Sequence, residues 1–405
     1  MKGSNHHKAA PVDYPFFTPG VWVMLGFMLV GLAFVIARYI LGLGGVTNLT
    51  NQYPWGLWIG VDVATGVALA AGGFTTAFLA HILHNDYYEV VTRPALLTAM
   101  LGYTFVSLGL FVDIGRSYNI WHPMIYHQPN SVLFEVAMCV MTYLTVLYIE
   151  FIPMVCERFI GKVNLPGPLA SLNGFVDKLL RFADKFLDKF MFIFIIAGVV
   201  LSCMHQSGLG SLLVIAPYKV HPLWYTPLLP FLFLLSAIAV GFPMVVFESF
   251  LASKSLHREL EMDVLSSLAK FTPILLGIYM AFKIGDLIHR GAYVYLLEGS
   301  VQSNSFLVEM IFGVIVPFAM LLSKKIRQSP MGLFVAMLLV VLGVALNRVN
   351  VFLVGFLPAY ASHHYFPSIG EMAITAGLIA GLMFLYRACV TIFPVLPVVE
   401  KVDEK

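Results

Sequence analysis

The stretch FMFIFIIAGVVLSCMHQSGLGSL, residues 190–212, decides the fold class of this chain. It is long and apolar enough to cross the hydrocarbon core of a bilayer, which takes about 20 residues. Near its end it carries His205 and Gln206, polar side chains that hydrocarbon accommodates poorly. The stretch therefore predicts a transmembrane helix that holds a polar feature in need of an explanation.

The whole chain has the composition of an integral membrane protein. Of its 405 residues, 59% are hydrophobic and 11% are charged, whereas soluble domains carry about 25% charged residues. The net charge of +2 gives no basic surface for nucleic acid. Apolar runs of sufficient length predict an all-α protein with ten transmembrane helices, at roughly 20–41, 56–83, 95–115, 131–153, 190–212, 226–251, 271–290, 305–323, 331–354 and 369–392.

The distribution of Lys and Arg predicts the orientation of these helices. With an N-terminal tail at 1–19 on the inside, all but six of the 24 basic residues lie in the tails and the inner connections. The positive-inside rule then places both termini in the cytoplasm, with a C-terminal tail at 393–405 and a transmembrane domain at 20–392. Residues 172–189 alternate aromatic and charged residues at helical spacing, which predicts an amphipathic helix on the cytoplasmic membrane surface.

The sequence offers no obvious set of metal ligands. Its four cysteines are scattered singly, without the paired spacing of zinc sites and cysteine-ligated iron–sulfur clusters. A bis-histidine haem needs two histidines at one depth. The only histidine besides His205 well within a span is His81, which lies about 20 Å away along the membrane normal. We therefore expect no metal site, haem or iron–sulfur cluster in this chain.

Polar residues that are unusual in membrane spans gather near the predicted outer ends of the helices. Such residues are expensive in a bilayer and favour a functional role, here in one outward-facing pocket. The alternative is that they are helix caps and residues of the interfacial aromatic belt. The candidate pocket residues are Trp55, Asp62, Asp113, Arg116, His205, Gln206, Trp224 and Arg348.

His205 is the most informative of these residues. It lies about 10 Å inside the outer end of its predicted helix, at 1.5 Å per residue. Its imidazole can donate or accept a hydrogen bond and can exchange a proton near neutral pH. Gly208 and Gly210 leave room for a flat ligand or for a neighbouring helix. These properties suit a quinone head group, and a hydrogen bond to a neighbouring helix is the structural alternative.

Carboxylates at stepped depths suggest a proton route. Glu135 and Glu248 are each embedded in an apolar run, which favours a role in passing protons between the pocket and the cytoplasm. Glu150, Asp286 and Glu309 are more simply explained as members of ion pairs or as interfacial residues.

Several of these residues lie in motifs that resemble a known family. The motifs YPWGLWIGVD (53–62), VDIGRSYN (112–119), NSVLFE (130–135), MHQSGLGSL (204–212) and VVFE (245–248) occur in one order along the chain. Together they resemble the NrfD/HybB-like family over residues 40–397, and within it the b-type membrane subunits of hydrogenase-2-type periplasmic [NiFe] hydrogenases. The segments NRVNVFLVG and SHHYF instead resemble membrane subunits of cytochrome-linked quinone reductases, so the identity of the partner stays open.

The resemblance implies a multi-pass subunit of the bacterial inner membrane that binds menaquinone or ubiquinone and holds no redox centre. It also implies periplasmic partners, namely a ferredoxin-like iron–sulfur subunit and a catalytic or multihaem cytochrome subunit. Proton translocation is a further expectation, for which Glu135 and Glu248 match the family's carboxylates. Asp113, Arg116 and His205 fall where the quinone pocket is expected.

The resulting hypothesis is a quinone-binding membrane subunit of a respiratory oxidoreductase. A secondary transporter, which would place its substrate at the membrane midplane, and a passive membrane anchor are the rival interpretations. In the hypothesis His205 and Asp113 bond or protonate the head group, Arg116 and Arg348 polarise the site, Trp55 and Trp224 wall it, and Glu135 and Glu248 connect it to the cytoplasm.

Overall fold

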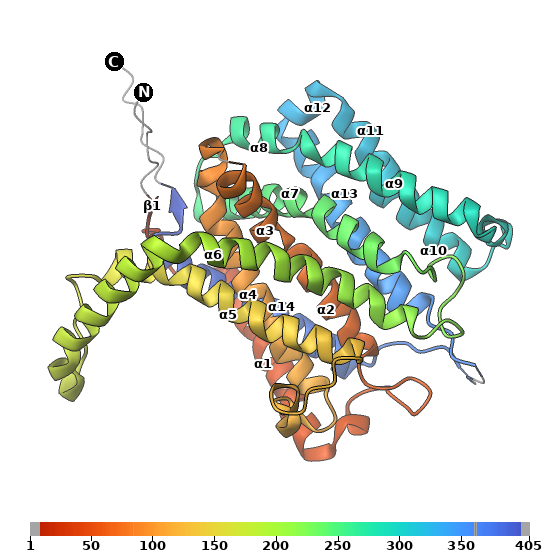
Figure 1. Cartoon of the computed structure of the whole chain (residues 1–405), viewed down its shortest axis with the longest axis horizontal. Helices are drawn as coiled ribbons and strands as arrows, with labels where there is room; N and C mark the ends of the chain where they lie inside the picture. The colour runs from red at the N-terminus through yellow and green to blue at the C-terminus, as the bar shows by residue number, and fades with distance from the viewer. Residues whose placement is uncertain (1–8, 84, 360, 362, 398–405) are drawn as a thin grey trace.

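The computed structural model describes residues 9–83, 85–359, 361 and 363–397 and is almost entirely helical (Figure 1). In this part of the chain, ten helical segments are long and apolar enough to cross a membrane, which confirms the expected number of spans. The elements are α1 (Pro19–Leu41), α2 (Leu57–Leu69), α3 (Ala71–Ala77), α4 (Glu89–Asp113), α5 (Val132–Phe159), α6 (Asn173–Val214), α7 (Leu229–Leu256), α8 (Met262–Leu268), α9 (Phe271–His289), α10 (Val301–Met310), α11 (Val316–Leu322), α12 (Lys324–Gln328), α13 (Pro330–Val349) and α14 (Ile369–Ile392), with strands β1 (Ala9–Ala10) and β2 (Leu396–Pro397).

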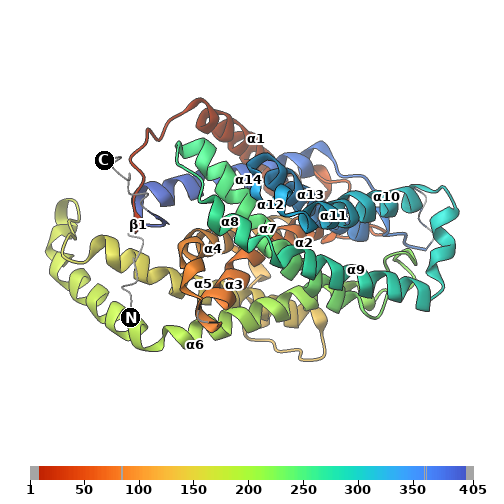
Figure 2. The same cartoon turned by 90° about the horizontal axis from the view of Figure 1, so that it is seen from above.

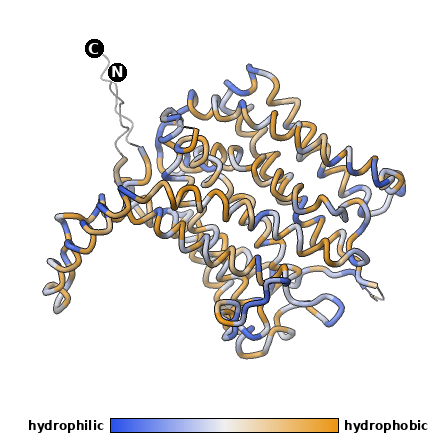
Figure 3. Tube along the Cα trace, viewed as in Figure 1, coloured by the Kyte–Doolittle hydropathy of each residue, from blue (hydrophilic) through white to orange (hydrophobic). Residues whose placement is uncertain are grey.

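Successive spans run in opposite directions, so the molecule has two faces. We call the face where α1 begins and α14 ends the terminal face, because both ends of the described chain lie there (Figure 1). We call the opposite face, where α4 ends and α5 begins, the distal face. The positive-inside prediction assigns the terminal face to the cytoplasm. Figure 3 shows that the spans are mainly hydrophobic and that hydrophilic residues concentrate at their ends.

The spans form two four-helix groups and a peripheral pair. Bundle one contains α2 with α3, α4, α5 and α6, and bundle two contains α7, α9, α10 with α11, and α13. The two bundles meet where α7 packs against α2, α3 and α6, while α14 packs against α4 and carries α1 on its outer side (Figure 2). Spans that follow one another in the chain pack as neighbours within each bundle, in an up-and-down arrangement.

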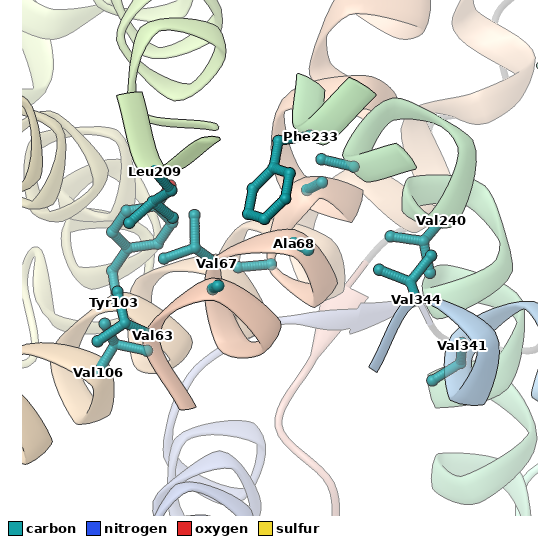
Figure 4. Packing of buried hydrophobic residues seen from close by; sticks show 14 of the residues in the cluster. Val63, Val67, Ala68, Tyr103, Val106, Leu209, Phe233, Val240, Val341 and Val344 are labelled. Atoms are coloured by element: carbon teal, nitrogen blue, oxygen red, sulfur yellow. The ribbon is translucent and has the colours of Figure 1, made fainter. Parts of the chain in front are cut away.

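Helix α2 forms the apolar contact between the two bundles. In Figure 4, Val67 and Ala68 lie between Tyr103 and Leu209 of bundle one and Phe233 of bundle two. These side chains are almost fully buried. Since lipid tails are as apolar as the side chains, close packing and not the hydrophobic effect holds such helices together in a membrane.

Small residues allow the closest helix contacts. A Cβ atom built on Gly31 of α1 would lie 2.9 Å from the Cα atom of Gly377 in α14. A Cβ atom on Gly343 of α13 would lie 2.3 Å from the Cα atom of Gly313, in the π-helical turn Ile311–Ile315 between α10 and α11. Both pairs therefore bring backbone against backbone, as is common between membrane helices.

The second span is interrupted, which its apolar sequence did not predict. Helix α2 ends at Leu69, α3 begins at Ala71, and the span finishes in a π-helical turn at Phe78–Ile82. At Gly73 a Cβ atom would lie 2.7 Å from the Cβ atom of Ala99, so glycine lets α3 approach α4. The seventh span also departs from the prediction, since the short helix α8 precedes α9.

Helix α6 extends beyond the bundle as an arm. The sequence predicted an amphipathic helix at 172–189 followed by a separate span, and the structure joins them into the single helix Asn173–Val214. In Figure 1 the N-terminal part of α6 bends away from the bundle beside the end of α5. The side chains of Phe175, Leu179 and Phe182 are 65%, 53% and 68% exposed, as expected for an apolar stripe that faces a membrane surface.

Candidate functional site

The structure separates the predicted site residues into three clusters and an exposed group, while Glu248 lies apart from these beside a cavity. Trp55, Arg116 and Glu135 form the exposed group at the distal face. Glu135 was predicted to be embedded in an apolar run, but it lies in the first turn of α5 with its side chain exposed. A carboxylate in the first turn interacts favourably with the helix dipole, so this position needs no buried partner.

The first cluster lies in the core of bundle one and contains His205. The imidazole is fully buried, and its Nδ1 atom lies 3.1 Å from the hydroxyl oxygen of Tyr103 on α4. Its Nε2 atom is buried without a hydrogen-bond partner in the described structure. The Tyr103 ring meets the Tyr143 ring of α5 edge to face, with centroids 4.6 Å apart. Ser202, one helical turn before His205, is also buried.

Gln206 connects this cluster to the interruption of the second span. Its Nε2 atom donates to the carbonyl oxygen of Val67 at 2.7 Å, while its Oε1 atom is buried without a partner in the described structure. Its donor thus engages a carbonyl in the last turn of α2, next to the break at Ala70. Gly210 makes room for a helix, since a Cβ atom there would lie 2.7 Å from the Cα atom of Pro230 in α7.

The second cluster surrounds Asp113 at the distal end of α4. Asp113 is fully buried, and its Oδ2 atom accepts a hydrogen bond of 2.6 Å from the backbone N–H of Gly56. The indole N–H of Trp58 is directed at the Asp113 carboxylate, although this contact falls outside ordinary hydrogen-bond geometry. Arg38 of α1 donates to the carbonyl oxygens of Val112 and Ile114, both at 2.7 Å, and so holds the backbone on either side of Asp113.

Two further carboxylates belong to the Asp113 cluster. Asp62 accepts a hydrogen bond from the hydroxyl of Thr375, and Glu371 caps the first turn of α14. The hydroxyl of Tyr365 donates to Glu371 Oε1 at 2.6 Å. Burial, together with this hydrogen bond, raises the pKa of Tyr365 well above its usual range, so the phenol stays protonated and remains the donor.

The third cluster fills the distal part of bundle two around Glu309. Glu309 accepts hydrogen bonds from Trp224 Nε1 at 2.9 Å and from the side-chain amide of Asn350 at 2.8 Å. It also accepts one from the amide of Asn347 at 2.8 Å, and Lys283 Nζ lies 3.7 Å from its Oε1 atom. This carboxylate is the acceptor that organises the centre of bundle two.

Arg348 belongs to the same part of bundle two. It is fully buried, donates to Ser236 Oγ at 2.8 Å, and stacks 3.7 Å above the ring centroid of Phe233. The hydrogen-bond partners of Arg348 and Trp224 thus lie in bundle two, and their sharing of one pocket with His205 stays a prediction. Asp286, by contrast, pairs with Arg290 at 2.8 Å, as expected of an ion pair.

The residues that neighbour His205 and Asp113 lie at different depths along α4. Tyr103, the partner of His205, precedes Asp113 by ten residues on α4, which corresponds to about 15 Å along the helix. We therefore describe His205 and Asp113 as two separate positions in bundle one, and their joint contact with one ring stays a prediction.

Two cavities lie toward the terminal face. A cavity of about 190 Å³ in the interior of bundle one is lined by Glu150 and Tyr143 and reaches Glu89 and Arg93 at the start of α4. Glu150 lies so close to α6 that a Cβ atom on Gly198 would be 2.8 Å from its Oε1 atom. A second cavity, of about 80 Å³, is lined by Glu248. One carboxylate oxygen of Glu248 is buried without a hydrogen-bond partner in the described structure, next to the hydroxyls of Thr98 and Tyr386.

The histidines do not fit a bis-histidine haem inside the bundle. Among the described residues His205 is the only fully buried histidine. His81 has an exposed side chain in the π-helical turn at the terminal end of the second span. Such a haem needs two imidazoles that face one iron, which this pair does not provide.

Sequence reasoning missed several members of these clusters. Tyr103, Trp58 and Glu371 were not singled out, although each contacts or neighbours a predicted residue. Tyr and Trp are tolerated in membrane spans and carry a polar end, so hydropathy alone does not mark them. For Glu371 the capping pattern SIGE, residues 368–371, was a usable signal, since serine followed three residues later by glutamate marks a helix start.

Comparison with known proteins gives one consistent family. Residues 45–358 match the family model described as polysulphide reductase, NrfD. The chain is 31% identical to the probable Ni/Fe-hydrogenase 2 b-type cytochrome subunit of Escherichia coli, over 98% of this chain and 97% of that protein. It is 26% identical to the menaquinone reductase integral membrane subunit of Nitratidesulfovibrio vulgaris, over 98% of both chains, and 25% identical to a selenate reductase subunit of Mesobacillus selenatarsenatis, over 89% and 91%. The chain is a multi-pass membrane protein that belongs to the NrfD family.

Proposed function

We propose that this chain is the quinone-binding membrane subunit of a respiratory oxidoreductase in the bacterial inner membrane. It exchanges electrons between a partner that docks on the distal face and the membrane quinone pool. The names of the relatives from E. coli, N. vulgaris and M. selenatarsenatis, which are subunits of a hydrogenase, a menaquinone reductase and a selenate reductase, support this assignment.

The observation that carries the proposal is a pair of orphaned polar atoms on residues adjacent in sequence. His205 Nε2 and Gln206 Oε1 are both buried and both lack a hydrogen-bond partner in the described structure. Buried polar atoms in native proteins are nearly always paired, so two such unpaired atoms indicate that a ligand completes them. A quinone carbonyl and a quinol hydroxyl have the complementary hydrogen-bonding groups.

The chemistry of the two side chains matches both redox states of a quinone. Reduction of a quinone to a quinol takes up two electrons and two protons. The Gln206 amide nitrogen donates to Val67. The unpaired amide oxygen can only accept a hydrogen bond, which suits the hydroxyl of a quinol. His205 Nε2 can donate or accept, depending on which nitrogen carries the proton, and the Tyr103 hydroxyl can serve either tautomer at Nδ1.

Asp113 and the surface beside it complete the site toward the distal face. We place Asp113, with Asp62 and Glu371, on the path by which protons exchange between the His205 cluster and that face. Trp55, whose side chain is 46% exposed, and Arg116 lie on the surface that the electron-donating partner would cover. Exposed aromatic residues and arginine are enriched in protein interfaces.

Exchange of protons with the terminal face would run through the cavity of bundle one. In this route Glu150 takes the place assigned from sequence to Glu135, because Glu150 lines the cavity and Glu135 is exposed at the opposite face. Tyr143 lines the same cavity and contacts Tyr103, which bonds His205. Carboxylates and hydroxyls linked by water can pass protons through a membrane protein.

The proposal is tested with variants in the purified complex. His205→Ala and Gln206→Leu should lower quinone-linked turnover by about 100-fold or more, the usual contribution of a positioned acid or base. His289→Ala, an exposed histidine at the end of α9, is the matched control and should keep full turnover. Full turnover in both His205→Ala and Gln206→Leu would remove the His205 cluster from the reaction.

A partner assay separates this function from its rivals. Mass spectrometry of proteins that copurify with the chain should find an iron–sulfur subunit together with a hydrogenase or a multihaem cytochrome subunit. A transporter would instead purify without a redox partner. A passive anchor would copurify with a redox partner but would tolerate the His205 and Gln206 variants.

A further inference from the structure

The two ends of the described chain come together on the terminal face. Strand β1 pairs with β2 in antiparallel fashion, with Ala9 opposite Pro397 and Ala10 opposite Leu396. The backbone N–H of Val12 donates to the carbonyl oxygen of Val390 at 2.9 Å. We call residues 9–16 together with residues 393–397 the terminal ribbon.

Three arginines from separate elements hold the terminal ribbon by its backbone carbonyls. Arg93 of α4 donates to Pro394 at 3.0 Å, and Arg258, which follows α7, donates to Pro397. Arg387 of α14 donates to Pro15 at 2.7 Å and to Phe16 at 3.0 Å. These bonds join a charged guanidinium to backbone carbonyls, and water can replace the carbonyls as acceptors when an attachment opens.

The ribbon lies over the cavity that contains Glu248. Leu396 and Pro397 line this cavity from the ribbon, and Arg258 lines it from the loop after α7. On the inner side the cavity reaches Tyr386 and Glu248, whose buried carboxylate lies beside the hydroxyls of Thr98 and Tyr386. The space is about 80 Å³, which is room for a few water molecules.

We propose that the terminal ribbon is a lid that controls the access of water and protons from the terminal face to Glu248. The paired strands are only two residues each, too short to be stable without their attachments. Opening the lid breaks these attachments and withdraws Val395 and Leu396 from the core, and it exposes a carboxylate between α4, α7 and α14. The proposal concerns access to Glu248 and stands whether or not a quinone binds at His205.

Thiol labelling in the purified complex tests the lid directly. In a chain whose four native cysteines are replaced by alanine, Ala252→Cys places a thiol in the cavity lining, and Lys254→Cys places one on the exposed surface of the same face. A charged methanethiosulfonate reagent labels both, and peptide-resolved mass spectrometry measures each rate. Each reporter is measured in two backgrounds. In the released background, Arg258→Gln and Arg387→Gln remove two of the three arginine attachments. In the locked background, Ala9→Cys and Pro397→Cys are oxidised to a disulfide that joins the two strands.

The reporter at position 252 should react about tenfold or more faster in the released than in the locked background, because labelling follows the population of the open state. The reporter at position 254 should react equally in both. Equal rates at position 252 in both backgrounds would overturn the lid. If the released variant does not assemble, the locked complex is compared with the same complex after reduction, and an unchanged rate at position 252 is again the refuting result.

Discussion

Neutralising Glu309 should destabilise bundle two through several lost contacts at once. Its Oε1 atom accepts from Asn347 and faces Lys283, and its Oε2 atom accepts from Trp224 and Asn350. In Glu309→Gln one of these two oxygens becomes an NH₂ group, so buried donors lose their acceptor whichever way the amide turns. Lys283, which is 4% exposed, also loses its counter-charge.

The size of this effect follows from its parts. Hydrogen bonds between membrane helices contribute about 0.6 kcal/mol each, and leaving a buried charge without its partner costs about 3–5 kcal/mol. We expect Glu309→Gln to lower the free energy of unfolding by about 4 kcal/mol, and we expect Lys283→Met to recover about half of this loss in the double variant.

The assay is reversible unfolding in mixed micelles by titration with sodium dodecyl sulfate, followed by tryptophan fluorescence. Glu298→Gln, a neutralised glutamate that is exposed in the loop before α10, is the matched control and should unfold like the parent. The reasoning fails if Glu309→Gln is as stable as Glu298→Gln, or if adding Lys283→Met makes the single variant still less stable.

Three further variants test other parts of the structure. Gly31→Val should lower the free energy of unfolding by about 1–3 kcal/mol in the same assay, because its Cβ atom would lie 2.9 Å from Gly377 Cα. The control Gly26→Ala should unfold like the parent, because the added Cβ atom meets nothing within 4 Å. Tyr103→Phe removes the hydroxyl beside His205 and should slow quinone-linked turnover by about tenfold while assembly is unchanged, as measured by steady-state kinetics and gel filtration. Glu150→Gln should slow turnover with little change in the KM for quinone, since it acts on proton supply; a raised KM with full turnover would place Glu150 in binding instead.

The ten spans could be predicted because the information for each is local. A run of about 20 apolar residues must be helical in a bilayer, whatever its neighbours are. The fifth span shows the limit of that argument. The sequence marks its apolar start near Phe190, but α6 begins at Asn173, because nothing between the amphipathic arm and the span stops the helix.

The grouping of the polar residues could not be predicted in the same way. Counting residues along a helix gives the depth of a side chain but not the neighbour toward which it points. Arg348 and His205 both lie in the distal half of their helices, yet one faces Ser236 and the other faces Tyr103. Glu135 shows the same limit, since its apolar neighbours suggested burial and its direction in the first turn of α5 exposes it.

The pattern of hydrogen-bond satisfaction distinguishes a structural cluster from a binding site. Both carboxylate oxygens of Glu309 are paired, and Arg348, which has an unpaired Nε atom in the described structure, stacks its guanidinium on Phe233. In the His205 cluster, by contrast, two residues adjacent in sequence, His205 and Gln206, each present an unpaired atom in the described structure. Each unpaired buried group costs about 1–3 kcal/mol. Proteins keep such groups at sites where a bound ligand supplies the missing hydrogen bond. We therefore place the ligand chemistry in the His205 cluster and assign the Glu309 cluster, whose carboxylate oxygens are both paired, the role of a rigid support for α2 and α6.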